Sequence, residues 1–254
     1  MKNTKASCFK NYAKFYTLLY SDKDYRSEAD YIIRLIKQDK SSAHSILELG
    51  CGTGNHARAL NQSGYYLHCI DFSQNMVDIA KRYTTDSLSF EQGDVRTYRC
   101  DKKFDIIISL FHVASYQTSN EDILQFIETA KHHLKKDGLF IFDFWYGPAV
   151  LSIKPEVRQK IVENDKFKII RFSRPELFVN KNVCDVHFNF LIIDKATDQI
   201  SELYEKHRMR YFFIPEIEYF LSQSSIEIID VYKWMTNEPL NIDTWNAVVV
   251  SKIS

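Results

Sequence analysis

The stretch that decides the fold is Ile46-Leu47-Glu48-Leu49-Gly50-Cys51-Gly52-Thr53-Gly54-Asn55-His56. The apolar residues at its start form a short run, which indicates a buried parallel strand. Three glycines at alternate positions follow, and residues 55–62 then read as a helix that ends before Gly64. A strand, a glycine turn and a helix in this order predict the first unit of a nucleotide-binding α/β fold, whose bare backbone lies against the ligand.

The spacing of the glycines narrows the class of ligand. A dinucleotide fold usually reads G-x-G-x-x-G, and its third glycine would fall on Asn55 here. Glu48 also stands two residues before the first glycine, where a carboxylate is poorly placed to help an anionic pyrophosphate. The same carboxylate suits a cationic or amine-bearing ligand. For this motif alone, a tight turn that binds no ligand is the alternative.

Composition excludes several classes of protein. The 254 residues can form one large core, or one domain with an insertion. The chain has 33 basic and 33 acidic residues, and the absence of a basic excess argues against nucleic acid as a partner. Its five scattered cysteines fit reduced thiols in the cytoplasm. The longest apolar runs are too short to cross a bilayer, so we expect no membrane partner.

A second ligand-binding position follows the next predicted strand. Residues 66–70 read as this strand, which ends at Asp71. Asp71 lies about 20 residues beyond the glycines, where an acid binds a ribose in such folds. Its two oxygens can accept hydrogen bonds from two vicinal hydroxyls. Ser73 then has the position of a helix N-cap.

Four motifs occur in an order that resembles the class I S-adenosylmethionine-dependent methyltransferases. Glu48 and the three glycines match the first motif, E/D-x-G-x-G-x-G, and residues 71–76 resemble the second, D-x-S-x-x-M. Gly93-Asp94 and the turn at 136–140 resemble the later ones. The resemblance covers residues 12–146 and 214–253. It implies an α/β fold with a Rossmann-like, mostly parallel seven-stranded sheet and an antiparallel final hairpin.

The resemblance also implies the cofactor, S-adenosyl-L-methionine, which leaves as S-adenosyl-L-homocysteine, and no metal. Tyrosines of the N-terminal segment would face the sulfonium, since aromatic faces suit a cation. Phe72 and Met76 would flank the adenine, and Asp94 would lie near its amino group; ordinary core packing is the alternative for Met76. The implied cofactor-binding residues are Tyr12, Tyr20, Glu48, Gly50, Cys51, Gly52, Asp71, Phe72, Met76, Gly93, Asp94, Val95 and Leu110.

The candidate catalytic residues follow two further predicted strands. Residues 104–110 indicate the central fourth strand, and His112 lies just beyond its carboxyl end, where open α/β sheets bind ligands. His112 is a candidate general base or acceptor-orienting group, with cofactor packing as the alternative. Asp143, Trp145 and Tyr146 end the fifth strand and are expected to face the acceptor. Tyr146 is the second catalytic candidate.

Residues 147–213 exceed what a standard core needs at this point. Three long strands are predicted, at 166–172, 183–193 and 199–212, and the second alternates apolar and polar residues. We predict an antiparallel β insertion that forms a lid or a dimer surface, with 1–146 and 214–254 as the cofactor-binding core. Its side chains that are candidates to reach substrate are Glu205, His207, Arg208, Arg210 and Tyr211, although a solvated strand face is the simpler interpretation for each.

The expected reaction is in-line transfer of a methyl group to a nitrogen or oxygen of a small molecule. The insertion resembles those of sugar-amine and glycine N-methyltransferases, and a homodimer is possible. Two alternatives stay open from the sequence: a protein that binds S-adenosylmethionine as a regulator without catalysis, and an NAD-dependent oxidoreductase. The glycine spacing and the final hairpin speak against the second.

Overall fold

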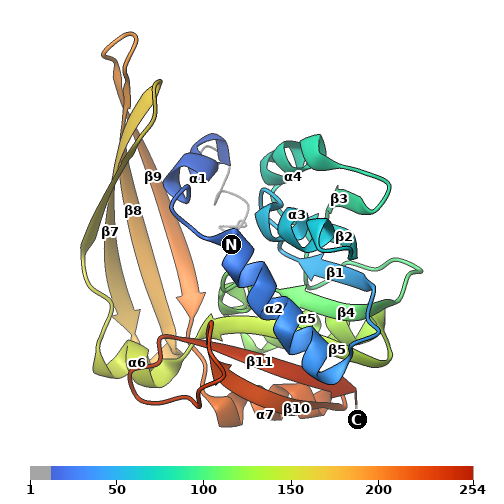
Figure 1. Ribbon diagram of the computed structural model, residues 1–254. Coiled ribbons are helices and arrows are strands. Elements are labelled where there is room, and N and C mark those ends of the chain that lie inside the picture. The colour runs from blue at the N-terminus through green and yellow to red at the C-terminus, as the bar shows by residue number, and fades with distance from the viewer. Residues whose placement is uncertain (1–12, 254) are drawn as a thin grey trace.

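The computed structural model describes residues 13–253, which form two β-sheets of different size (Figure 1). The larger sheet has seven strands in the order β10-β11-β5-β4-β1-β2-β3. They span Ser45–Leu49 (β1), Tyr66–Asp71 (β2), Leu88–Gln92 (β3), Phe104–Ser109 (β4), Leu134–Trp145 (β5), Ile226–Lys233 (β10) and Asn246–Ile253 (β11). β1 to β5 are parallel, whereas β11 is antiparallel to both of its neighbours. This arrangement confirms the predicted fold class.

Helices cover both faces of this sheet. The helices of the described residues span Ala13–Leu19 (α1), Tyr25–Asp39 (α2), Asn55–Gln62 (α3), Gln74–Ala80 (α4), Asn120–His133 (α5), Gly147–Ser152 (α6) and Ile214–Gln223 (α7). The apolar stripes of α2 and α3 pack on one face, and those of α5 and α7 pack on the other. The two clusters of buried side chains leave the carboxyl ends of β1, β2, β4 and β5 to form the site.

α5 leads directly into β5. The side chain of Ser119 caps the start of α5 by accepting the Asp122 N–H at 3.0 Å. β5 starts at Leu134, immediately after α5, so Gly138 lies within the strand. A Cβ on Gly138 would lie 2.9 Å from the carbonyl oxygen of Asp105, so glycine lets two neighbouring strands approach closely.

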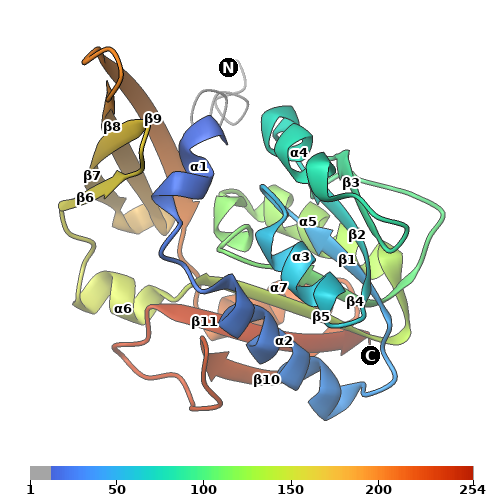
Figure 2. The ribbon, with the colours of Figure 1, turned by 45° about the horizontal axis from the view of Figure 1, so that its top comes forward.

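The smaller sheet is antiparallel and has the strand order β6-β7-β8-β9. Its strands span Arg158–Glu163 (β6), Phe167–Phe178 (β7), Val183–Asp194 (β8) and Ile200–Arg210 (β9). β6 was not predicted, because it is a short and mostly exposed edge strand in which half of the residues are charged. The inner face of the sheet packs against α1 and Met76 of α4, so α1 lies between the sheet and the core (Figures 1 and 2).

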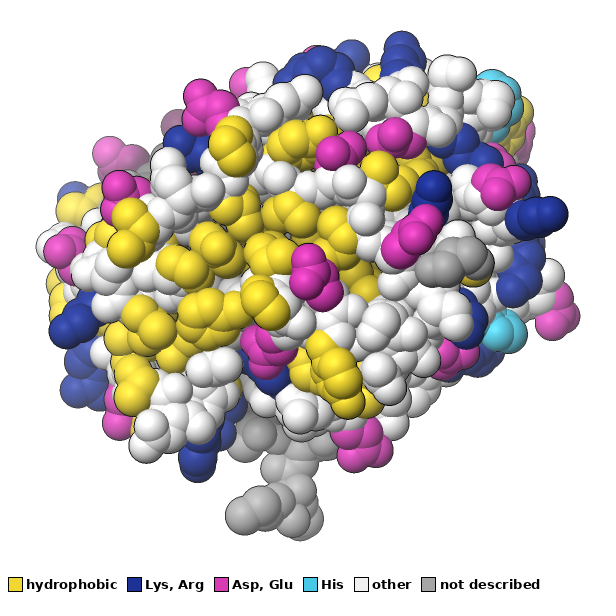
Figure 3. Space-filling view, turned by 90° about the horizontal axis from the view of Figure 1, so that it is seen from below, with side chains coloured by type: hydrophobic (Ala, Val, Ile, Leu, Met, Phe, Trp, Pro, Cys, Tyr) yellow, Lys and Arg dark blue, Asp and Glu magenta, His cyan; other side chains and the backbone are white. Residues whose placement is uncertain are grey.

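The underside of the molecule, seen in Figure 3, presents a broad apolar area bordered by charged side chains. α7, β10 and β11 lie on this side in Figure 1, and β10 is an edge strand. These elements and the loop before β11 contribute apolar residues that are only partly buried, among them Ile214, Ile228, Val231, Leu240 and Ile253. Within residues 13–253, no helix has the length and apolar character that a membrane span requires.

Candidate active site

A cavity of about 1060 Å³ lies between the large sheet and the inner face of the small one. The glycine turn after β1, Asp71 at the end of β2 and His112 after β4 all line it. Arg171 of β7 and His207 of β9 line it from the small sheet. The cavity therefore occupies the edge of the sheet at which open α/β folds bind their ligands.

The three glycines of the turn serve different purposes, although all have positive φ: 85° at Gly50, 55° at Gly52 and 79° at Gly54. A Cβ on Gly50 would lie 2.5 Å from the side chain of Val113, and one on Gly54 would lie 2.8 Å from the ring of Phe90. A Cβ on Gly52 would meet no atom within 4 Å. Gly52 thus exposes its backbone to the cavity, as a turn that holds a ligand through peptide groups requires.

Asp71 fixes this turn from below. One carboxylate oxygen accepts the N–H of Gly52 at 2.8 Å, and the other accepts the N–H of Ser73 at 2.8 Å. Burial raises the pKa of Asp71, and these two hydrogen bonds oppose that effect. A carboxylate has about four acceptor positions, so lone pairs remain for the hydroxyls of a ribose. The open backbone at Gly52 and the acceptor groups of Asp71 fit the adenosyl part of S-adenosylmethionine.

Most of the predicted cofactor residues line this one cavity. They are Tyr20, Gly50, Cys51, Gly52, Asp71, Phe72, Met76, Asp94, Val95 and Leu110. Glu48 and Gly93 are not among the lining residues, and Tyr12 lies outside the described residues. A Cβ on Gly93 would press on Tyr98 and Ile70, so this glycine serves the packing of the turn.

Glu48 lies buried beneath the glycine turn, with 1% of its surface exposed. Its Oε2 has no hydrogen-bond partner within residues 13–253. Burial raises the pKa of Glu48 to about 7, against the opposing charge of His56. Glu48 therefore does not line the cavity and lies behind the turn that borders it.

Two kinds of lining residue were missed from the sequence. Tyr16 lies on the same helical stripe as Tyr20, and its ring centroid is 4.7 Å from that of Tyr20. Arg96 forms ion pairs with Asp94 at 2.5 Å and with Asp122 at 2.6 Å. The tyrosine spacing contained the signal for Tyr16. Arg96 lies only two residues from Asp94, but its second partner, Asp122, is 26 residues away and is revealed only by the fold.

His112 and Asp143 form a dyad at the ends of β4 and β5. The Nδ1 of His112 lies 2.6 Å from Oδ2 of Asp143, and the backbone N–H of His112 donates to Oδ1 at 3.0 Å. The Asp143 side chain is 1% exposed, so it contacts His112 and not the acceptor space. An ionised Asp143 requires the hydrogen of the imidazole on Nδ1, which leaves the Nε2 lone pair for other partners.

The backbone at the dyad is unusual. Phe111 and His112 have φ values of 63° and 66°, a conformation that costs a non-glycine residue free energy. Two successive residues of this kind turn the chain sharply after β4 and place the imidazole at the cavity. Trp145 also lines the cavity, but Tyr146 does not: it packs on the apolar core cluster, and its N–H donates to the Trp245 carbonyl at 2.9 Å.

The inner face of the small sheet forms the opposite wall. Arg158, Arg171, Glu205 and His207 line the cavity there, and Arg208 also borders it. Arg210 and Tyr211 do not line it, and Arg210 forms an ion pair with Glu216 of α7. Of the five insertion residues predicted to reach substrate, the structure therefore brings three to the cavity.

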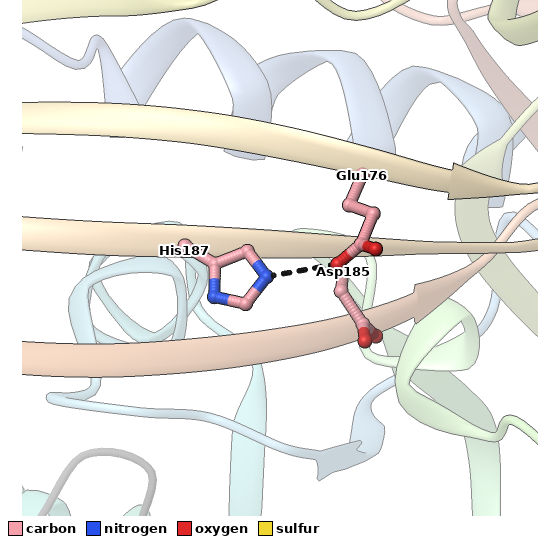
Figure 4. A group of neighbouring side chains, drawn as sticks. All are labelled: Glu176, Asp185 and His187. Atoms are coloured by element: carbon pink, nitrogen blue, oxygen red, sulfur yellow. Dashed lines mark hydrogen bonds and ion pairs between the residues drawn. The ribbon is translucent and has the colours of Figure 1, made fainter.

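A group of three side chains that could bind a metal ion lies on the strands of the small sheet (Figure 4). It comprises Glu176, Asp185 and His187, whose ligand atoms lie within 4.8 Å of one another. Asp185 already accepts two hydrogen bonds from Arg208, at 2.6 and 2.8 Å, and one from Lys206 at 2.6 Å. Two neighbouring cations would repel a divalent ion, so the group fits an ion-pair network better than a metal centre.

Comparison with known proteins identifies the class. Residues 46–138 match the family model described as a methyltransferase domain. The chain is 26% identical over 196 residues to the dTDP-3-amino-3,4,6-trideoxy-alpha-D-glucopyranose N,N-dimethyltransferase of Streptomyces venezuelae, covering 76% of this chain and 82% of that protein. It is 27% identical over 202 residues to the dTDP-3-amino-3,6-dideoxy-alpha-D-glucopyranose N,N-dimethyltransferase of Streptomyces fradiae, covering 79% and 77%.

The fold is also known. The crystal structure of an S-adenosylmethionine-dependent methyltransferase from Clostridium acetobutylicum superposes with a TM-score of 0.81 at 21% identity, covering 97% of this chain and 99% of that one. Residues 46–138 thus carry a methyltransferase domain, and the chain as a whole is similar in sequence and in fold to S-adenosylmethionine-dependent methyltransferases. These findings favour the methyltransferase over the oxidoreductase and the regulator that the sequence left open.

Proposed function

We propose that the enzyme methylates an amine of a small molecule and releases S-adenosyl-L-homocysteine. The observation that carries this proposal is the His112–Asp143 dyad, which presents an imidazole lone pair to the cavity beside the glycine turn. The names of the Streptomyces relatives, both N,N-dimethyltransferases of amino sugars, support nitrogen as the methylated atom.

S-adenosylmethionine supplies an activated methyl group on a sulfonium when it is bound. Gly52 and Asp71 would hold its adenosyl part, and the faces of Tyr16 and Tyr20 suit the cationic sulfur. An amine that arrives as an ammonium must lose a proton before it can attack. Nε2 of His112 takes that proton, and Asp143 stabilises the imidazolium that forms.

The opposite wall indicates a further property of the acceptor. Arg158 and Arg171 line the cavity from β6 and β7, and Nε of Arg171 is buried with no hydrogen-bond partner among residues 13–253. Arg158 is exposed and Arg171 is half-buried, and guanidinium groups at a cavity bind carboxylate or phosphate oxygens. We therefore propose an acceptor that carries an anionic group away from the amine, as a nucleotide-linked amino sugar does. On this proposal residues 147–213 form the acceptor-binding insertion on a cofactor-binding core of 1–146 and 214–254.

The test is transfer of a labelled methyl group to a panel of primary amines, headed by the two amino sugar nucleotides of the Streptomyces relatives. We expect turnover by the wild type, and a fall in kcat of about 100-fold or more for His112→Asn. Asp143→Asn should also lower kcat, whereas Asp86→Asn at an exposed site should not. Calorimetry with S-adenosylhomocysteine checks that each variant keeps the cofactor site. Tight cofactor binding without transfer to any amine would contradict the proposal.

A further inference from the structure

A second chain of hydrogen-bonded polar side chains lies at the cavity, separate from the His112–Asp143 dyad. The hydroxyl of Tyr116, in the short helix at Ala114–Tyr116 after β4, lies 2.6 Å from Nδ1 of His207. Nε2 of His207 lies 3.0 Å from Oε2 of Glu205 on the same strand, β9. All three residues line the cavity. The chain therefore links the core to the small sheet at the ligand space.

The order of donors and acceptors along this chain follows from its end. An ionised Glu205 only accepts hydrogen bonds, so Nε2 of His207 carries the ring hydrogen. Nδ1 of the neutral ring is then an acceptor, and Tyr116 must donate its hydroxyl hydrogen to it. With its hydrogen directed at His207, the Tyr116 oxygen offers a ligand lone pairs and no donor.

Packing alone does not account for this polar chain. Glu205 and His207 are each 5% exposed, and removing such groups from water is costly. Their neighbours on the same face of the sheet, Val186 and Phe188, are apolar, and the Phe188 ring lies edge-on to His207 at 4.9 Å. Apolar residues at 205 and 207 would continue this surface at lower cost. A polar pair retained at this place points to a ligand.

We propose that Tyr116 is a specificity-determining residue that accepts a hydrogen bond from an N–H or O–H of the methyl acceptor. His207 and Glu205 are positioning residues that fix the direction of the Tyr116 hydroxyl. Since Nε2 of His112 is also an acceptor, the two polar groups at the cavity select a molecule with at least two donors. A primary ammonium, or an amine beside a hydroxyl, meets that requirement. This inference rests on the proposed amine methylation.

The test measures kcat and KM with the aminodideoxyglucose nucleotide of the Streptomyces fradiae relative, as the primary amine and as its N-monomethyl form, or with whichever amine of the panel is methylated. Tyr116→Phe removes the accepting oxygen. Glu205→Gln keeps the size and hydrogen bonding of the side chain but no longer fixes the His207 tautomer. We expect each to raise KM for the primary amine about tenfold, with kcat within about threefold of the wild type. KM for the N-monomethyl form should rise less.

The controls make the same chemical changes away from the cavity. Tyr219→Phe on α7 and Glu202→Gln on β9 alter exposed side chains and should leave both constants unchanged. An unchanged acceptor KM in Tyr116→Phe and Glu205→Gln would overturn the inference and leave the proposed function standing. A lower melting temperature together with an equal rise in KM for every acceptor would also overturn it. That result would mean that Tyr116, His207 and Glu205 only hold the small sheet in place. If the wild type binds cofactor but methylates no amine, the proposed function fails, and the inference fails with it.

Discussion

At the scale of single residues, two glycines of the turn after β1 share a positive φ but are required for different reasons. Gly50 and Gly52 both have positive φ. A side chain at position 50 would clash with Val113, whereas one at position 52 would project into open space. The first glycine is therefore required by the packing of the protein, and the second by what occupies the cavity. Substitutions should separate these two requirements.

Gly52→Ala should weaken binding of S-adenosylhomocysteine about tenfold or more, because the new methyl group projects into the cavity. Its left-handed conformation should cost about 1–2 kcal/mol of stability, so the variant still folds. Gly50→Ala adds a clash at 2.5 Å and should lose far more stability. Calorimetry and denaturant unfolding measure the two effects. Full affinity in Gly52→Ala would contradict the assignment of the turn.

Glu48 makes the stability of the ligand-free protein depend on pH. Its pKa rises from 4.5 to about 7 on folding, so the folded state holds the proton more tightly than the unfolded one. Stability should fall as pH rises from about 4.5, by at most roughly 3 kcal/mol, and level off above 7. Glu48→Gln should remove this contribution. Urea unfolding of both proteins between pH 5 and 8 provides the measurement, and parallel curves would refute the expectation.

At the scale of elements, Asp105 joins the beginnings of two neighbouring strands. Its carboxylate accepts the backbone N–H groups of His44 and Ser45 at 3.1 and 3.0 Å, the Ser45 hydroxyl at 2.7 Å and the Lys135 ammonium at 3.0 Å. Burial would raise its pKa, but these partners outweigh burial and lower it. Asp105 therefore fixes the start of β1 against β4, and β1 leads into the glycine turn.

Asp105→Asn should cost about 1–3 kcal/mol at pH 7, because the neutral amide keeps one acceptor oxygen for the N–H groups but loses the ion pair with Lys135. A lowered pKa means that this stabilisation is present above the unfolded value of about 4 and is lost as pH falls further. The difference between variant and wild type should thus shrink below pH 4. Thermal unfolding across pH 3–7 tests this, with the exposed Asp86→Asn as control.

Sequence patterns predicted helices and caps well where the signal depends on residues close together in the chain. The helix at 55–62 and the N-cap at Ser73 agree with the structure, because caps and apolar spacing act over a few residues. Long-range pairing was harder to foresee. β6 lacks a strong apolar pattern, and the bonds from His112 to Asp143 and from Tyr116 to His207 span 31 and 91 residues. Only the assembled sheets reveal such partners.

At the scale of the whole molecule, two sheets divide the cavity between them. The large sheet supplies the glycine turn, Asp71 and His112, and the small sheet supplies two arginines and the pair Glu205–His207. The first set fits an adenosyl group, and the second set suits a charged acceptor. A ligand that resembles only the cofactor, or only the acceptor, should therefore bind whether or not the other ligand is present.

S-adenosylhomocysteine at 100 times its Kd should stabilise the folded chain by about 2.7 kcal/mol. For a protein of this size, that corresponds to a rise in melting temperature of roughly 5–10 °C. NAD at the same concentration should give no shift, because the glycine spacing does not match a pyrophosphate site. Thermal scans with each compound make the comparison, and a shift with NAD alone would reverse the cofactor assignment.

The small sheet leaves the core after β5 and returns beside it, where Phe212 and Tyr146 form a β-bridge. Its strands can thus change in sequence while β1 to β5 keep their places. On the proposed function, substitutions in residues 158–210 change the choice of acceptor, whereas substitutions in the turns after β1 and β2 change cofactor binding. The family model, which matches residues 46–138, ends before the first strand of that adaptable region.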